Sequence, residues 1–210
     1  MTRSLFLVVT AAILVSVPQT ARADIIRYFA NLNGPSESPP NASLGTGTAL
    51  VGVDTVANTM HVQVSFSGLT TGTTASHIHA ATALPGVGTA SVATTVPTFP
   101  GFPLGVTSGT YDQTFNTLDP ATYNPAFVTA NGGTAAGAEA ALAAALASDR
   151  AYLNIHTTAF PGGEIRGFLV PAATVVPEPT SLALLGGGLV GLIVWRRRRS
   201  GQRGGAPSAS

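Results

Sequence analysis

Three histidines in this chain are spaced in a way that suits metal binding. His77 and His79 flank Ile78, so in a β-strand both imidazoles project from one face. Their Cα atoms would then lie about 6 to 7 Å apart, a common spacing for two ligands of one ion. His156 shares a strand face with Asn154 in a second apolar stretch. If these two strands are neighbours, the pattern predicts a copper or zinc site; the alternative is three neutral, partly buried, hydrogen-bonding histidines.

Glu164 and Arg166 form a second pair of chemistry-bearing residues, at i and i+2 near the end of the apolar part of the chain. This spacing places both side chains on one strand face. Such a pair is usually solvated and of little energetic weight, but it can also pin a strand through charge-assisted hydrogen bonds. We favour a structural role for both residues.

The composition excludes several classes of function. The chain has no cysteine, which excludes a disulfide scaffold, a thiolate zinc site and a cysteine nucleophile. A Gly-x-Ser-x-Gly elbow, a phosphate loop and a dinucleotide fingerprint are also absent from the sequence. Residues 24–170 carry three arginines, no lysine and eight acidic residues, a formal charge of −5. We therefore expect no nucleic-acid partner and no enzymatic activity.

Alternation of apolar and polar residues indicates the strands that would position these side chains. In residues 60–66 the even positions are apolar and the odd ones polar, which is typical of a half-buried antiparallel strand. Residues 56–59 precede it as a turn. Region 85–125 is rich in Pro, Gly and Thr and predicts loops with one or two short strands around 106–115. The other predicted strands are 26–31, 50–54, 75–80, 151–156 and 164–170.

The stretch from Thr134 to Asp149 departs from this alternation. It is rich in alanine, the strongest helix former, and carries Leu142 and Leu146 at i and i+4. It predicts one short helix whose apolar stripe packs on the sheet. The fold class is therefore mainly β, an antiparallel β-sandwich or an open barrel with one short Ala-rich helix.

Residues 1–23 predict a secretory signal peptide. A charged start is followed by an uncharged run at 5–17 and by Pro18, and Ala21 and Ala23 fit the small-x-small cleavage pattern. Thirteen residues rise only about 20 Å as a helix, which is too short for a bilayer core of about 30 Å. The body of the protein is therefore expected to be exported.

The C-terminal end combines three features in order. A linker at 171–179 is followed by a short transmembrane helix predicted at 180–195 and a basic cytoplasmic tail at 196–210. The linker ends in the triplet Pro177, Glu178 and Pro179. Together these features resemble the PEP-CTERM sorting signal of Gram-negative bacteria. The resemblance implies an exosortase-type processing enzyme as partner, export across the inner membrane, anchoring by the C-terminal helix, and then a location at the cell surface or in the extracellular matrix.

A set of motifs follows in order along the body of the chain, residues 24–170: Asn33–Pro40, Gly68–Leu69, His77–Ala80, the Ala-rich helix, 151–156 and 161–168. In this order they resemble the CHRD domain, a family named for repeats in chordin. The resemblance implies a β-rich extracellular domain and no particular reaction. It implies six signature positions: His77, His79, Asn154, His156, Glu164 and Arg166.

Two functions follow as expectations. The first is a non-enzymatic binding or structural role in the cell envelope or exopolysaccharide matrix, with polysaccharide or envelope components as partners and no cofactor. The alternative is an exported protein that binds copper or zinc through His77, His79 and His156. The His-x-His strand also faintly resembles copper/zinc superoxide dismutase, but cysteines and a long loop with aspartate ligands are missing, and His61 lies on another strand.

Overall fold

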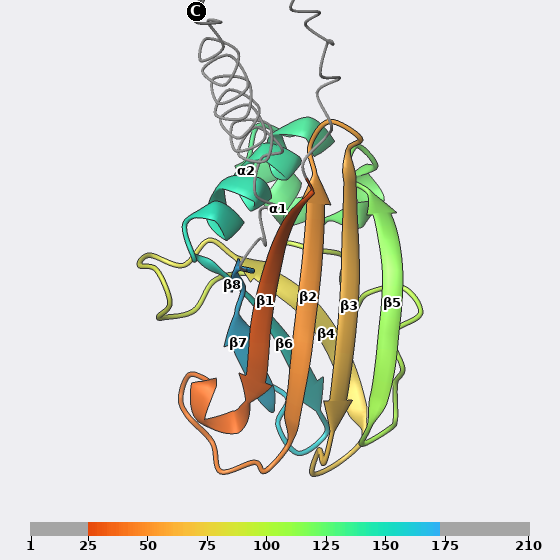
Figure 1. The fold of residues 1–210 in the computed structure, drawn as a ribbon, viewed down its shortest axis with the longest axis vertical. Helices are drawn as coiled ribbons and strands as arrows, with labels where there is room; N and C mark the ends of the chain where they lie inside the picture. The colour runs from red at the N-terminus through yellow and green to blue at the C-terminus, as the bar shows by residue number, and fades with distance from the viewer. Residues whose placement is uncertain (1–24, 173–210) are drawn as a thin grey trace, which may run out of the picture. The chain divides into compact units, whose positions relative to one another are not determined.

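The domain is one curled, antiparallel β-sheet, a half-barrel, in the computed structural model, which describes residues 25–172 (Figure 1). The strand order is β4-β6-β7-β1-β2-β3-β5, and β8 pairs with β1 beside β7. The strands are β1 (Ile26–Asn33), β2 (Thr46–Asp54), β3 (Thr59–Ser67), β4 (Thr73–Ala80), β5 (Gly109–Asn116), β6 (Ala151–Thr157), β7 (Ile165–Phe168) and β8 (Val170–Pro171).

The long strands follow the alternation read from the sequence. In β3 the even residues are buried and the odd ones face outward, as predicted. The hairpin between β2 and β3 closes where the sequence predicts a turn: the Asp54 carboxylate accepts hydrogen bonds from the N–H groups of Val56 (2.9 Å) and Ala57 (2.8 Å). Asn58 completes the turn with a φ of 53°, in the left-handed region that asparagine tolerates.

The concave face of the sheet holds the hydrophobic core. Buried side chains from β1, β2 and β3 share one cluster with Ile78 of β4 and Leu153 of β6. The segment before β5 covers the outer edge of β4, where Ser76 accepts a hydrogen bond from the N–H of Phe99 (3.0 Å). Phe99 is fully buried in the core. The edge of β4 is therefore paired with chain rather than left open.

Two helices lie at one end of the sheet, near the β2–β3 turn (Figure 1). The Ala-rich helix is confirmed as α2 (Ala135–Ala147), whose first turn is capped by the Thr134 hydroxyl, 3.1 Å from the Gly137 nitrogen. It buries Leu142 and Leu146 in the core. A shorter helix, α1 (Pro125–Ala130), was not expected from the sequence.

The architecture agrees with a mainly antiparallel β-fold carrying a short helix, and the single curled sheet is closer to the open barrel than to the sandwich. Strand β5 is longer than the short strands expected in region 85–125. Within residues 25–172, none of the helices has the length and apolar character needed to cross a membrane. The predicted signal peptide, sorting triplet, transmembrane helix and basic tail lie outside the described residues.

Leu146 should be a main contributor to the packing of α2 on the sheet, because its side chain is fully buried. We expect Leu146→Ala to lower the free energy of unfolding by about 2–5 kcal/mol, through lost transfer free energy and an unfilled cavity. Urea denaturation measures the difference. The matched control is Leu118→Ala: Leu118 is 47% exposed, and its truncation should cost about 0.5 kcal/mol or less. Equal losses in the two variants would contradict the packing of α2.

Candidate metal centre

The three candidate histidines lie together on the convex face of the sheet, opposite the core. Strands β4 and β6 are antiparallel neighbours, as the prediction required, and their register places His77 opposite Asn154. The adjacent Ile78 and Leu153 face the other way and are fully buried. Because side chains alternate along a strand, burying these two residues in the core turns the histidines to the opposite face.

The three imidazole rings form a compact cluster. The ring centroid of His77 lies 5.3 Å from the ring centroid of His79 and 4.8 Å from that of His156. One ring nitrogen from each histidine lies within 4.8 Å of the others. Tetrahedral zinc with bonds of about 2.0–2.1 Å brings its nitrogen ligands to about 3.3 Å apart, so small side-chain rotations would close the cluster around an ion.

Backbone carbonyls fix the tautomer of each ring. His77 Nε2 lies 3.0 Å from the Pro97 carbonyl oxygen, and His79 Nδ1 lies 2.8 Å from that of Ala90. His156 Nδ1 lies 2.9 Å from the Pro161 carbonyl oxygen. A carbonyl can only accept, so each of these nitrogens carries the proton. The other nitrogen of each neutral ring therefore presents a lone pair.

These remaining nitrogens are buried and have no hydrogen-bond partner within residues 25–172. They are His77 Nδ1, His79 Nε2 and His156 Nε2. An imidazole that donates through one nitrogen to a carbonyl and offers the other to an ion is the usual arrangement of a histidine ligand. The donor set of three neutral imidazoles suits zinc or copper.

The pKa values keep the cluster neutral at pH 7. Burial lowers the pKa of His77 to about 3, reinforced by repulsion from His156 and His79. Burial likewise lowers the pKa of His79 to about 4 and outweighs the opposing hydrogen bond to Ala90. The pKa of His156 is also lowered by burial. Neutral imidazole is the form that binds a metal.

A buried arginine adjoins the cluster. The guanidinium of Arg166 lies 4.7 Å from the ring centre of Tyr152, and that ring stacks on His79 at 4.7 Å. Arg166 Nη1 donates to the Gly88 carbonyl (3.1 Å), and Nε donates to the Ser36 carbonyl. Arg166 is therefore held by backbone oxygens of two loops beside the histidines.

Glu37 completes this group from the loop after β1. Its Oε2 lies 3.8 Å from Arg166 Nε, and its Oε1 accepts a hydrogen bond from Asn154 Nδ2 (3.3 Å). Burial raises the pKa of Glu37 to about 7, against the smaller lowering effects of Arg166, the Ser38 N–H and Asn154. Gly163 makes the contact possible, because a Cβ there would lie 2.3 Å from Asn154 Nδ2.

Glu164 is buried apart from this group and does not pair with Arg166. Its carboxylate accepts hydrogen bonds from the Ser43 hydroxyl (2.6 Å), the Thr157 hydroxyl (2.5 Å) and the Thr70 N–H (2.6 Å). Burial raises the pKa of Glu164, but these hydrogen bonds together lower it by more than burial raises it. The pKa of Glu164 therefore lies below its ordinary value. Of the two expectations for Glu164 and Arg166, the geometry corresponds to strand pinning rather than to a solvated pair.

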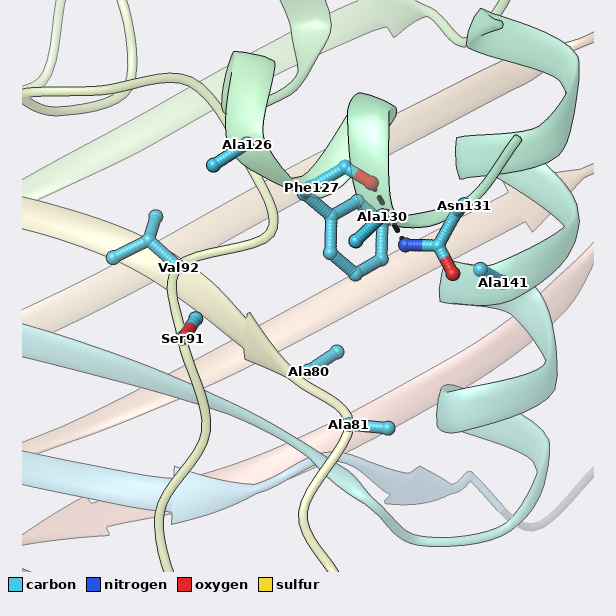
Figure 2. A pocket seen from close by; sticks show the side chains of 9 residues that line it. All are labelled: Ala80, Ala81, Ser91, Val92, Ala126, Phe127, Ala130, Asn131 and Ala141. Atoms are coloured by element: carbon cyan, nitrogen blue, oxygen red, sulfur yellow. Dashed lines mark hydrogen bonds between the residues drawn. The ribbon is translucent and has the colours of Figure 1, made fainter. Parts of the chain in front are cut away.

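Two other features lie away from the cluster. The fourth histidine, His61, is on β3, where its exposed ring is 2.6 Å from Asp112. A pocket of about 350 Å³ lies between the end of β4 and the two helices, where Phe127 and Ala130 face Ala80 (Figure 2). None of the residues that line this pocket carries a titratable side chain, so the lining supplies no acid–base group.

Sequence reasoning found the histidines, Asn154, Glu164 and Arg166, but missed Glu37 and Tyr152 as their neighbours. Glu37 lies within the Asn33–Pro40 motif, which by itself assigns no role to this side chain. One signal was available: Glu37 is one of few acidic residues in the body and stands next to a Pro-rich loop. The motif did not show which side chain it would meet.

Comparison with known families gives two matches. The model of the CHRD domain matches residues 28–169, and that of the PEP-CTERM protein-sorting motif matches residues 175–199. The second match implies export and membrane-linked sorting by an exosortase in Gram-negative bacteria. No curated protein and no solved structure shows significant similarity to the chain.

The buried histidines should make the metal-free protein sensitive to acid. In the unfolded chain each takes up a proton below about pH 6.5, whereas the folded pKa values of His77 and His79 are about 3 and 4. Their stabilising contribution is therefore complete above pH 6.5 and is lost as the pH falls. Between pH 6.5 and 5 we expect a loss of roughly 2 kcal/mol per histidine.

Urea denaturation in the presence of a chelator, repeated across this pH range, measures the loss. In His77→Gln the free energy of unfolding should fall less steeply with falling pH, because one of the buried histidines no longer contributes to the loss. The control Asn31→Gln, at an exposed residue of β1 that carries no titratable group, should keep the slope of the parent. A parent profile that is flat from pH 6.5 to 5 would show that the rings are not held neutral by burial.

Proposed function

The chain belongs to the CHRD domain family, and we propose that its exported domain binds one copper or zinc ion through His77, His79 and His156. One observation carries this proposal: three buried imidazole nitrogens face one another while the second nitrogen of each ring is occupied by a backbone carbonyl. The family relationship identifies the domain but assigns it no ion.

The purely structural alternative accounts less well for the same geometry. A histidine that serves only as a hydrogen-bonding residue has both nitrogens satisfied or one of them exposed to water. Here three lone pairs are buried side by side, each at a cost of about 1–3 kcal/mol when unsatisfied. A bound cation satisfies all three at once, which supports a ligand role.

The donor atoms favour a particular class of ion. Magnesium and calcium prefer oxygen ligands, whereas imidazole nitrogens suit zinc, copper and their neighbours in the first transition series. The three histidines leave one position of a tetrahedral ion without a histidine ligand, the arrangement seen where a metal keeps a place for water.

A second candidate function concerns the location of the domain. The match to the PEP-CTERM motif supports an exosortase substrate that acts at the cell envelope or in the exopolysaccharide matrix. Under this proposal the protein binds matrix components without catalysing a reaction, and the metal site serves binding or stability. The two candidate functions are compatible in one molecule.

Metal analysis tests the first proposal. We expect the protein, purified without a histidine tag and dialysed against zinc or copper, to retain about one ion per chain by elemental analysis. The double variant His77→Ala, His79→Ala removes two of three ligands and should retain essentially none, because a single imidazole binds weakly.

The matched control is His61→Ala, which removes a histidine from β3 and leaves the cluster intact. It should keep the stoichiometry of the parent. Circular dichroism establishes that the double variant is folded. A folded parent without metal, or a folded double variant with undiminished metal, would contradict the proposal.

Processing at the sorting triplet tests the second candidate function, that of an exosortase substrate. In the producing bacterium we expect the mature protein to lack the residues after Pro177–Pro179, including all five arginines of the tail. Intact-mass measurement gives the cleavage position. Glu178→Ala should leave the full-length chain in the membrane fraction, whereas Thr174→Ala, just outside the matched motif, should be processed normally. Normal processing of the Glu178 variant would show that the processing enzyme does not need the intact triplet for recognition.

A further inference from the structure

A fourth buried acceptor belongs to Asn154, the residue paired with His77. Asn154 Oδ1 has no hydrogen-bond partner among the described residues, and the side chain is only 2% exposed. Asn154 stands directly opposite His77 in the pairing of β4 with β6, and it precedes His156 by two residues on the same strand face. Side chains of directly opposed residues are neighbours, with Cβ atoms about 4.5–5.5 Å apart.

The orientation of the amide follows from its other end. Asn154 Nδ2 donates to Glu37 Oε1, and Glu37 is itself held beside Arg166. When Glu37 is ionised, exchanging the amide nitrogen and oxygen would set two acceptor oxygens against each other, so above pH 7 the network assigns the nitrogen to Glu37. The backbone of Gly163 packs against this nitrogen and leaves no room for a side chain there. The oxygen is therefore the free end of the amide.

Four acceptors cannot satisfy one another. The imidazole lone pairs of His77, His79 and His156 can all be met by one cation, but the Asn154 oxygen then still lacks a donor. An unsatisfied buried carbonyl costs about 1–3 kcal/mol. A water bound to the cation carries the missing proton, because it coordinates through oxygen and donates through hydrogen.

We infer that Asn154 Oδ1 accepts a hydrogen bond from a water or other small protic ligand in the fourth position of the ion held by the three histidines. This inference rests on the proposed metal site. Asn154 thereby determines which ligand the site takes: it favours water, hydroxide and similar protic molecules over aprotic anions. Glu37 and Arg166 act through Asn154 as positioning residues.

Azide binding to the cobalt-loaded protein tests the inference. Co²⁺ takes the place of zinc and gives a visible spectrum that shifts when an anion displaces water. In the parent, azide brings no proton and leaves Asn154 Oδ1 unpaired. We expect Asn154→Leu, which removes this acceptor at similar size, to bind azide about tenfold more tightly than the parent.

The matched control is Asn31→Leu, the same change at an exposed residue of β1. It should bind azide as the parent does. Equal azide affinity in the parent and in a folded, cobalt-loaded Asn154→Leu would overturn the inference and leave the metal site standing. If a folded Asn154→Leu loses cobalt while Asn31→Leu retains it, the inference is also overturned, because the amide oxygen would then be a direct ligand of the ion.

A measurement on the unaltered chain tests for the protic ligand if Asn154→Leu does not fold. Electron–nuclear double resonance of the copper-loaded parent should show a strongly coupled proton that disappears in D₂O, distinct from the weakly coupled, remote N–H protons of the imidazoles. A copper site without such a strongly coupled exchangeable proton would overturn the inference. Failure of the parent to bind cobalt or copper at all would instead remove the proposed metal site, and the inference with it.

Discussion

The pairing of β4 with β6 is the contact on which the polar cluster depends, because it joins residues that lie more than seventy positions apart in the chain. Its register sets His77 against Asn154 and His79 against Tyr152. A slip by one residue would turn the histidines into the core and bring Ile78 to the convex face. The full burial of Ile78 and Leu153 on the concave face makes such a slip costly, so the hydrophobic core also holds the cluster in place.

The convex face carries an unusual concentration of buried polar groups, and most of them are satisfied. Arg166 reaches two loop carbonyls, and Glu164 accepts hydrogen bonds from two hydroxyls and one N–H. Against this background the atoms without a partner among the described residues are informative: three imidazole nitrogens within 4.8 Å of one another, and the oxygen of Asn154, the residue paired with His77; all four are acceptors. Among the described residues, Asp149 Oδ1 is the one other buried side-chain atom without a partner, so four of these five atoms belong to this part of the fold, which supports the proposed ligand role.

Sequence patterns predicted the elements better than the site. Alternation located the strands because each buries one face, and alanine content located α2 because helix propensity adds up over many residues. Helix α1 was missed, although Asn124 and Pro125 are a typical helix start, because it has only six residues. The shared face of His77 and His79 follows from strand geometry alone. Their adjacency to His156 could only be stated as a condition, since strand order depends on contacts across the whole chain.

The covering of the cluster could not be predicted, because loops supply it. Pro97 and Ala90 belong to the long connection between β4 and β5, where no periodicity shows which carbonyl will meet which ring. Glu37 reaches Asn154 across 117 positions of sequence. Pairing at such a distance follows from the packing of the loop after β1 on β6 and β7, which local propensity does not encode.

Burial of the cluster also separates the two candidate functions in space. His77 is 6% exposed and Asn154 2%, beneath loops that reach the rings through their own carbonyls, so a polymer cannot reach the imidazole nitrogens. The proposed ion and its small protic ligand match the size of the cluster, whose ring nitrogens lie within 4.8 Å of one another. A matrix polysaccharide would have to bind elsewhere on the domain. A metal ion could then affect polysaccharide binding only through the loops whose carbonyls contact the histidine rings. Under the two proposals, binding at the envelope and binding of a metal therefore use different parts of one fold.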